Sequence, residues 1–258
     1  MRVVFCIMMF VLGACFGSFL CCQARRLRLK ETGKKKLGAR SVCLHCNKSL
    51  KWYENIPLIS WLIQRGKCRK CHKSIGVAEF FSEVGVALAF LGLSVNINVQ
   101  NATPLEWGIF ASTLTLILSL AFLAIYDGLY GELPSFTLII SIICGAVVLI
   151  LKLWGVPFTL NPVWSVLILG GLYLLLYLIS KGKWVGDGDW LLGTAIGLAL
   201  ASPWLALVTL FISNTLACIV MLPFVKKSKN HHIHFGPFLV IALVITLSFS
   251  SFLESVVL

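Results

Sequence analysis

Long apolar runs, separated by short polar stretches, make up most of the chain. Most of these runs are close to the ~20 residues that an α-helix needs to cross the hydrocarbon core of a bilayer. Helices are the expected spanning element, because a backbone in lipid must satisfy its polar groups internally. The pattern predicts an all-α polytopic membrane protein with about eight transmembrane helices, of which the sixth is short. The runs are Val3–Cys22, Gly76–Leu93, Trp107–Tyr126, Leu133–Leu151, Pro162–Ser180, Asp189–Ala201, Pro203–Val225 and Phe235–Phe252.

Composition and charge agree with this prediction. Of the 258 residues, 59% are hydrophobic, and the mean hydropathy is +0.93. The net charge of +12 does not indicate a nucleic-acid partner, because 15 of the 22 lysines and arginines lie between Arg25 and Lys73. Such clustering is typical of cytoplasmic loops. With eight crossings the other basic clusters fall on the same side, so we expect the N-terminus to lie outside.

Three parts are predicted: a first transmembrane helix over residues 1–22, a cytoplasmic basic loop over residues 23–75, and a seven-helix membrane core over residues 76–258. The loop contains two C-x2-C pairs that are 21 residues apart, which is close to zinc-ribbon spacing. Four thiolates complete a tetrahedral structural zinc site with no open position. The alternatives are four free thiols or, with the opposite topology, two disulfides. The predicted ligands are Cys43, Cys46, Cys68 and Cys71.

The chain contains three aspartates, and all three lie at the predicted cytoplasmic edge of the membrane. Asp127 closes the third run, whereas Asp187 and Asp189 open the sixth. A helix dipole favours an anion in the first turn and disfavours one in the last turn. Asp187 and Asp189 therefore have a structural explanation, in which one caps the helix and the other complements its dipole. Asp127 has none, and ionisable groups at membrane depth usually mark a functional site.

Helix geometry limits which aspartates can share a site. Residues two apart on a helix point about 200° away from each other. We therefore expect Asp127 to pair with one of the other two aspartates. Two carboxylates in one site cannot both ionise cheaply, so one keeps a proton while the other activates water. That is the chemistry of aspartic peptide hydrolysis. Gly186 and Gly188 lack side chains and would let a substrate backbone approach closely.

Several motifs resemble those of the prepilin peptidases, also called type IV leader peptidases. The G-x-G-D element matches Gly186–Asp189, and the family's other aspartate falls on Asp127, ahead of Leu133-Pro134. The paired C-x2-C motifs and the segments GSFL, ENIPLISWL and FGPFL extend the resemblance over nearly the whole chain. The departures from the family pattern are Ser135 in place of an Asp after Leu-Pro, Cys21 in place of an Asn after GSFL, and residues 74–77 in place of an Arg-Tyr-Pro segment.

The resemblance implies an integral-membrane aspartic endopeptidase of the bacterial inner membrane. The family cuts basic leaders from type IV prepilins and pseudopilins, and its catalytic aspartates match Asp127 and Asp189. The helix-dipole argument makes Asp189 the base and Asp127 the proton carrier. Many members then methylate the new N-terminus with S-adenosylmethionine, which is therefore an expected cofactor. The expected partners are a prepilin or pseudopilin and the lipid bilayer. A prepilin leader lies in the cytoplasm, so the active site is expected on that side.

Two acidic residues and two rival functions stay open. Glu79 and Glu83 lie four residues apart on one helix face. They could meet the substrate's leader or its new amine, or point at the headgroup zone or a bundle cavity; the resemblance favours Glu79.

The first rival function is a proton-coupled transporter that uses Asp127 and Asp189 as a proton relay, which would need carboxylates near the membrane midplane. The second is a non-catalytic scaffold of a pilus or secretion system.

Overall fold

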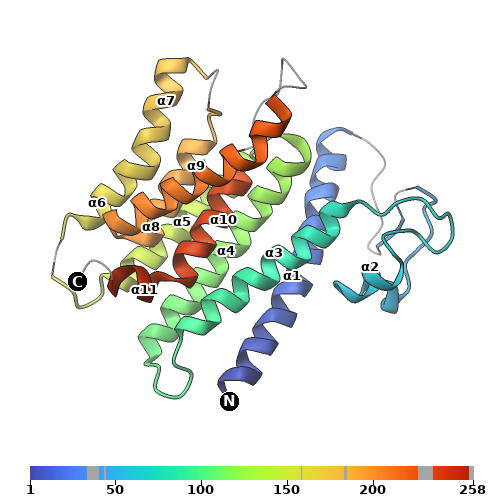
Figure 1. The fold of residues 1–258 in the computed structure, drawn as a ribbon, viewed down its shortest axis with the longest axis horizontal. Coiled ribbons are helices and arrows are strands. Elements are labelled where there is room, and N and C mark those ends of the chain that lie inside the picture. The colour runs from blue at the N-terminus through green and yellow to red at the C-terminus, as the bar shows by residue number, and fades with distance from the viewer. Residues whose placement is uncertain (34–40, 44, 158, 183–184, 226–234, 256–258) are drawn as a thin grey trace. The chain divides into compact units, whose positions relative to one another are not determined.

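The computed structural model describes residues 1–33, 41–43, 45–157, 159–182, 185–225 and 235–255. Within these ranges the chain is helical, with no strand and two isolated β-bridges, so the all-α prediction is confirmed. The elements in Figure 1 are α1 (Arg2–Glu31), η1 (Trp52–Asn55), α2 (Ile59–Ile63), α3 (Val77–Asn96), α4 (Pro104–Tyr130), α5 (Ser135–Lys152), α6 (Asn161–Val166), η2 (Leu167–Gly171), α7 (Leu172–Ser180), α8 (Asp189–Leu200), α9 (Pro203–Val225), α10 (Gly236–Ser248) and α11 (Ser250–Ser255).

All eight predicted runs form helices, but two of them are short. Among the described residues, six helical stretches are long and apolar enough to cross a membrane: α1, α3, α4, α5, the continuous stretch Asn161–Ser180, and α9. In contrast, α8 has 12 residues and α10 has 13. At 1.5 Å per residue, α8 is roughly 18 Å long, well short of the ~30 Å hydrocarbon core. The prediction of about eight apolar helices is thus confirmed, with six long enough to span by length and composition and two, α8 and α10, shorter.

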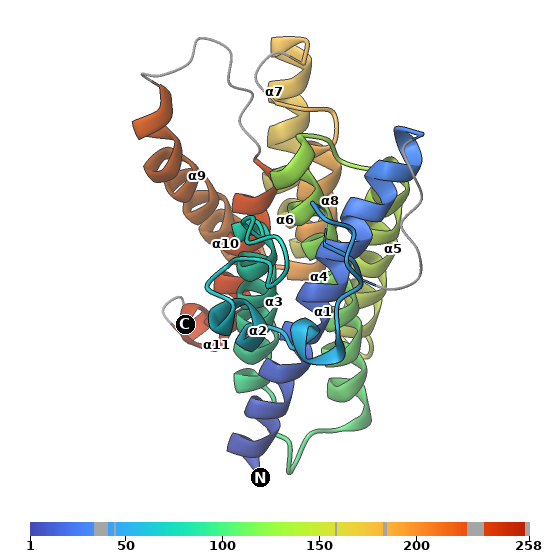
Figure 2. The same ribbon diagram turned by 90° about the vertical axis from the view of Figure 1, so that its right-hand side faces the viewer.

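The chain divides into two compact units, Val3–Leu91 and Gly92–Leu258, and the boundary falls inside α3. In the first unit, α1 continues to Glu31, beyond the predicted end at Cys22. It packs closely against α3, because a Cβ on Gly13 would lie 2.7 Å from the carbonyl oxygen of Val86. Only a residue without a side chain permits such an approach of two helix backbones. The segment between α1 and α3 carries η1 and α2 (Figure 2).

In the second unit, α8 is the most enclosed helix. It contacts α5, α6, η2, α7, α9 and α10. Small residues make this enclosure possible, because a Cβ on Gly193 would lie 2.8 Å from the Leu169 carbonyl oxygen and one on Gly197 would lie 2.8 Å from the Val166 Cα. The C-terminus of α8 is closed by Lys152, whose Nζ donates to the Ala199 carbonyl at 2.7 Å. Asp189 therefore stands at the start of a helix that is held from all sides.

The outer surface of the second unit suits lipid, as α5 illustrates. Every third or fourth residue of α5 is a large exposed apolar side chain, and the intervening stripe is buried. The exposed stripe is Phe136, Ile139, Ile143, Val147 and Ile150, and the buried one is Leu138, Ser141, Gly145 and Val148. A soluble protein rarely exposes a continuous apolar stripe of this size. This surface agrees with a helix that faces hydrocarbon on one side.

Candidate functional site: an aspartate pair and a cysteine cluster

Asp127 lies in the last turn of α4, and its side chain is 5% exposed. The helix ends because Gly131 adopts the left-handed conformation (φ 71°) and its N–H donates to the Asp127 carbonyl at 2.8 Å. The Asp127 Oδ2 accepts a hydrogen bond of 3.1 Å from the N–H of Gly236, the first residue of α10. A Cβ on Gly236 would lie 2.8 Å from the same oxygen. Glycine is therefore the residue that lets this amide reach the carboxylate.

Asp189 opens α8 and is 7% exposed. Its Oδ2 accepts a hydrogen bond of 3.1 Å from the N–H of Gly186, and its own N–H donates to the Gly186 carbonyl at 3.3 Å. This reciprocal pair closes the turn between the two residues. The carboxylate is thereby held at the positive end of α8, where a helix dipole favours an anion.

The structure brings Asp127 and Asp189 within electrostatic range of each other. Asp187 is also within electrostatic range of Asp189, but it is exposed while Asp189 is buried. The expectation that an aspartate caps α8 is wrong, because the N-cap is Gly188 and no side chain caps this helix. Asp189 itself orders the turn, through the Gly186 amide. Among the described residues, the Asp187 side chain therefore makes no hydrogen bond at the start of α8.

The dipole argument that separated the two aspartates also needs correction. Asp127 does lie at the C-terminal end of its own helix, as predicted. Its carboxylate, however, accepts from the first amide of α10, so it also meets the positive end of a helix. Each carboxylate is bound by one backbone amide near a helix N-terminus. Helix dipoles therefore do not assign the base to Asp189 and the proton to Asp127.

The two glycines of the G-x-G-D element have different surroundings. Gly186 is exposed, and a Cβ there would meet only the Asp189 carboxylate, at 3.4 Å. Gly188 is buried, and a Cβ there would lie 2.6 Å from the Leu133 Cδ1. Close approach of a substrate backbone, which the sequence suggested for both, is open only at Gly186. Gly188 is required for packing against Leu133.

Two neighbours of the pair were not identified from the sequence. Gly236 lies in the FGPFL segment. The proline after it is typical of a first helical turn, and this pattern could have indicated that a helix begins at Gly236. Tyr173 on α7 is 3% exposed and lies within electrostatic range of Asp189. A single tyrosine within an apolar run gave no signal of its own.

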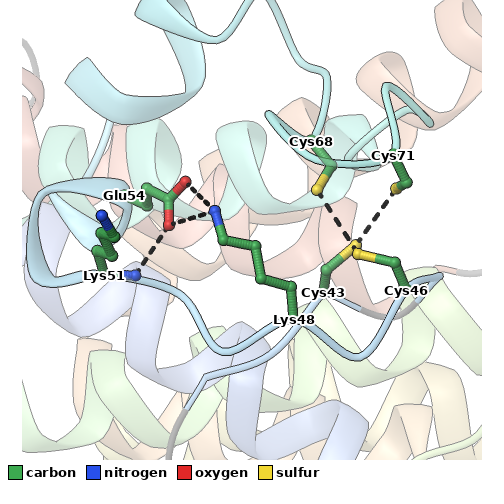
Figure 3. Close-up of polar contacts among 7 residues, drawn as sticks. All are labelled: Cys43, Cys46, Lys48, Lys51, Glu54, Cys68 and Cys71. Atoms are coloured by element: carbon green, nitrogen blue, oxygen red, sulfur yellow. Dashed lines mark hydrogen bonds and ion pairs between the residues drawn. The ribbon is translucent and has the colours of Figure 1, made fainter.

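The first unit contains the predicted cysteine cluster (Figure 3). All four sulfur atoms lie within 4.8 Å of one another, so they could hold a metal ion such as zinc. Two Sγ pairs across the two knuckles, Cys43–Cys71 and Cys46–Cys68, are 3.9 and 4.0 Å apart, about twice the length of a disulfide bond. All ten cysteines of the chain are free. The disulfide alternative is thus not realised. The cluster is formed by Cys43, Cys46, Cys68 and Cys71.

The two knuckles share one backbone geometry. In the first, the Asn47 N–H donates to the Cys43 carbonyl at 2.9 Å, and Asn47 has φ 53°. In the second, the His72 N–H donates to the Cys68 carbonyl at 2.9 Å, and His72 has φ 55°. Each turn is closed by an antiparallel bridge one residue before its first cysteine. Two congruent turns that present four thiols to one point fit a closed tetrahedral metal site.

The electrostatics of the cluster also fit a cation. The N–H groups of Cys71 and Lys70 lower the pKa of Cys68 to about 6. The Lys73 amide likewise favours the thiolate of Cys71, but burial and the neighbouring thiols outweigh it and raise the Cys71 pKa to about 11. Four thiolates cannot share this space without a positive charge. A divalent metal would supply that charge.

A buried ion pair joins the first knuckle to η1 (Figure 3). The Glu54 side chain is 1% exposed, and it accepts from Lys48 Nζ at 2.9 Å and from the Lys51 N–H at 2.9 Å. The Lys51 amide and then the Lys48 ammonium lower the pKa of Glu54 below its usual range. Glu54 was not singled out from the sequence, yet it fixes the knuckle to the segment that follows it.

Glu79 and Glu83, which the sequence left open, are both bound within the first unit. Glu79 forms an ion pair with Arg25 of α1. Glu83 is 6% exposed and accepts a hydrogen bond of 2.6 Å from the N–H of Leu58, a residue with φ 62° just before α2. These contacts connect α3 to α1 and to the cysteine-containing segment. They give both acids a structural role inside this unit.

Comparison with known proteins places the chain in a family. Residues 11–97 match the family model described as Bacterial Peptidase A24 N-terminal domain. A prepilin leader peptidase/N-methyltransferase of Aeromonas hydrophila is 32% identical over 218 residues, which cover 79% of this chain and 69% of that protein. The chain belongs to the prepilin leader peptidase/N-methyltransferase family. Family membership and the apolar helices together indicate a multi-pass protein of the inner membrane.

Two further relatives carry the same name. The prepilin leader peptidase/N-methyltransferase of Stutzerimonas stutzeri is 29% identical over 220 residues, or 78% of this chain and 69% of that protein. That of Myxococcus xanthus (strain DK1622) is 42% identical over 86 residues, or 33% of this chain and 25% of that protein. No solved structure matches the chain. The resemblance stated from the motifs is confirmed.

Proposed function

We propose that this protein is an integral-membrane aspartic endopeptidase that cleaves the leader from type IV prepilins or pseudopilins. The observation that carries the proposal is the juxtaposition of two buried carboxylates, Asp127 at the end of α4 and Asp189 at the start of α8. Each is bound by one backbone amide, from Gly236 and Gly186. The names of the relatives supply the substrate class.

The pair would work as a shared proton site. When two carboxylates share one site, one keeps a proton at neutral pH. The ionised partner accepts a proton from water as the water oxygen attacks the peptide carbonyl carbon, and the protonated partner gives its proton to the carbonyl oxygen. Collapse of the tetrahedral intermediate breaks the C–N bond, and the amine leaves with a proton from the pair. The amides of Gly186 and Gly236 hold the two carboxylates in place.

The site is proposed to lie at the cytoplasmic edge of the membrane, with the N-terminus outside. Fifteen of the 22 lysines and arginines lie between Arg25 and Lys73, and such clusters stay in the cytoplasm. Asp127 and Asp189 both stand at helix ends, not at helix centres. This placement supports a peptidase over a midplane proton relay. A basic leader in the cytoplasm would deliver its scissile bond to that edge.

Zinc and S-adenosylmethionine are proposed as cofactors on different grounds. Bound zinc would supply a structural cross-link and the positive charge that four thiolates require, with no open position for catalysis. The ligands would be Cys43, Cys46, Cys68 and Cys71. N-methylation of the new N-terminus with S-adenosylmethionine follows from the names of the relatives alone.

The test is cleavage of a prepilin with a Gly-Phe junction by the purified full-length protein in detergent. Asp127→Asn and Asp189→Asn are each expected to lower the rate by about 10⁴-fold or more, because loss of one member disables a pair that acts as a unit. Asp187→Asn, which replaces an exposed residue in the same turn, is the matched control and should keep most of the activity. A folded wild-type protein that leaves the prepilin uncut would contradict the proposal, and a scaffold should tolerate all three changes.

A further inference from the structure

A buried tyrosine lies near the aspartate pair. Tyr173 of α7 is 3% exposed, and its side chain lies within electrostatic range of Asp189. Its ring packs on that of Phe235, with the ring centroids 5.2 Å apart. Phe235 directly precedes Gly236, whose amide binds Asp127. Tyr173 is therefore within electrostatic range of Asp189 and packs on the residue that precedes the amide bound to Asp127.

The Tyr173 hydroxyl is a buried group with no hydrogen-bond partner among the described residues. Ser213 and Asn214 of α9 lie near it and carry oxygens that can accept, but neither forms a hydrogen bond with the Tyr173 hydroxyl; each donates to the Leu210 carbonyl, at 2.9 and 2.8 Å. A buried polar group usually has a partner, because burial removes the hydrogen bonds that it would make with water. Within the described ranges, the hydroxyl is thus a donor without a hydrogen bond, within electrostatic range of Asp189.

The local sequence does not require a hydroxyl at this position. The helix reads LYLLLYLIS, so a phenylalanine would fill the same space without an unpaired polar group. The π-helical turn Leu167–Gly171 comes directly before α7. Such turns hold one extra residue and occur frequently at functional sites. Packing against Phe235 accounts for an aromatic ring at position 173, but it does not account for the hydroxyl group that the ring carries.

We propose that Tyr173 is a third functional residue of the peptidase site, and that its hydroxyl donates a hydrogen bond to the carbonyl oxygen of the scissile peptide bond. This inference rests on the proposed peptidase function. The carbonyl oxygen gains negative charge as water adds to the carbon, so a fixed donor stabilises the transition state more than the bound substrate. No bond to Tyr173 forms, and the hydroxyl keeps its proton. The proton that the oxygen receives comes from the aspartate pair.

The test is Tyr173→Phe in the full-length protein, assayed on the same Gly-Phe prepilin. This change keeps the ring contact with Phe235 and removes only the oxygen. We expect kcat to fall about 100-fold, as for the loss of one oxyanion donor, with KM little changed. The unfolding temperature in detergent should stay the same or rise, because an unpaired buried hydroxyl is removed. Tyr177→Phe, one turn further along α7, is the matched control and should keep the wild-type kcat.

The outcomes separate this inference from the proposed function. If Tyr173→Phe cuts at the wild-type rate while Asp127→Asn and Asp189→Asn are inactive, the role of Tyr173 is wrong and the peptidase stands. If Tyr173→Phe lowers the unfolding temperature, or raises KM with kcat unchanged, the hydroxyl serves folding or ground-state binding and the inference is overturned. If folded wild-type protein leaves the prepilin uncut, both proposals fail.

Discussion

The cysteine cluster and the aspartate pair are built over very different lengths of chain. The most distant sulfur contact joins residues 28 positions apart, and each knuckle closes within a single turn. The Asp127 carboxylate is instead held by an amide 109 positions away, at the start of α10. Short-range turns form from local sequence, whereas the aspartate pair exists only when α4, α8 and α10 are packed together. Different substitutions should therefore disable the two sites.

The largest effect is expected at the cysteine cluster. Cys68→Ser removes one of four ligands from a site whose metal affinity provides much of the folding free energy, about 10 kcal/mol or more in small zinc domains. We expect the bound zinc to fall from about one equivalent to a trace, and residues 41–74 to become sensitive to protease. Metal analysis and limited proteolysis measure both. Cys218→Ser, an exposed cysteine of α9, is the control. Retention of zinc by Cys68→Ser would contradict the four-thiolate site.

An intermediate effect is expected where α10 meets the aspartate pair. Gly236→Ala places a Cβ 2.8 Å from the Asp127 Oδ2, so the carboxylate must move. A shift of about 1 Å at a reacting group costs roughly 100-fold in rate, and we expect that loss in prepilin cleavage with zinc content unchanged. Gly128→Ala is the matched control, because its Cβ would meet only Pro237, at an ordinary 3.8 Å. Equal activity of the two variants would show that Asp127 does not depend on α10.

The smallest effect is expected at the far end of α8. Lys152→Met removes the ammonium group that donates to the Ala199 carbonyl, but it keeps most of the apolar stem. Loss of a charged hydrogen bond at a helix C-terminus should cost about 1 to 2 kcal/mol of the free energy of unfolding. Thermal unfolding in detergent measures this cost, with the zinc content again unchanged. Lys181→Met, an exposed lysine after α7, is the control. An unchanged unfolding temperature for Lys152→Met would mean that α8 is held by packing alone.

Much of the fold could be predicted from hydrophobic pattern, because runs of about 20 apolar residues have few alternatives in a membrane. The clustering of the four cysteines followed from their spacing for a similar reason, since a C-x2-C pair already defines its turn. The lengths of α8 and α10 were less predictable. Helix ends depend on local contacts, such as Lys152 at the C-terminus of α8 and the left-handed Ala201 that follows it. No aspartate side chain caps α8, and Asp189 instead closes the preceding turn by accepting from the Gly186 amide.

The sequence by itself determined the class of protein, the cysteine site and the two aspartates proposed for catalysis. These properties depend on composition and on residues close together in the chain, which a linear pattern records. Only the tertiary structure decided that Asp127 meets the first amide of α10 and that Gly188 packs on Leu133. It also decided that the Tyr173 hydroxyl has no hydrogen-bond partner in the described part of the chain. The physical reason is distance along the chain. A hydrogen bond or a steric limit between helices depends on how those helices pack, and no local pattern contains that information.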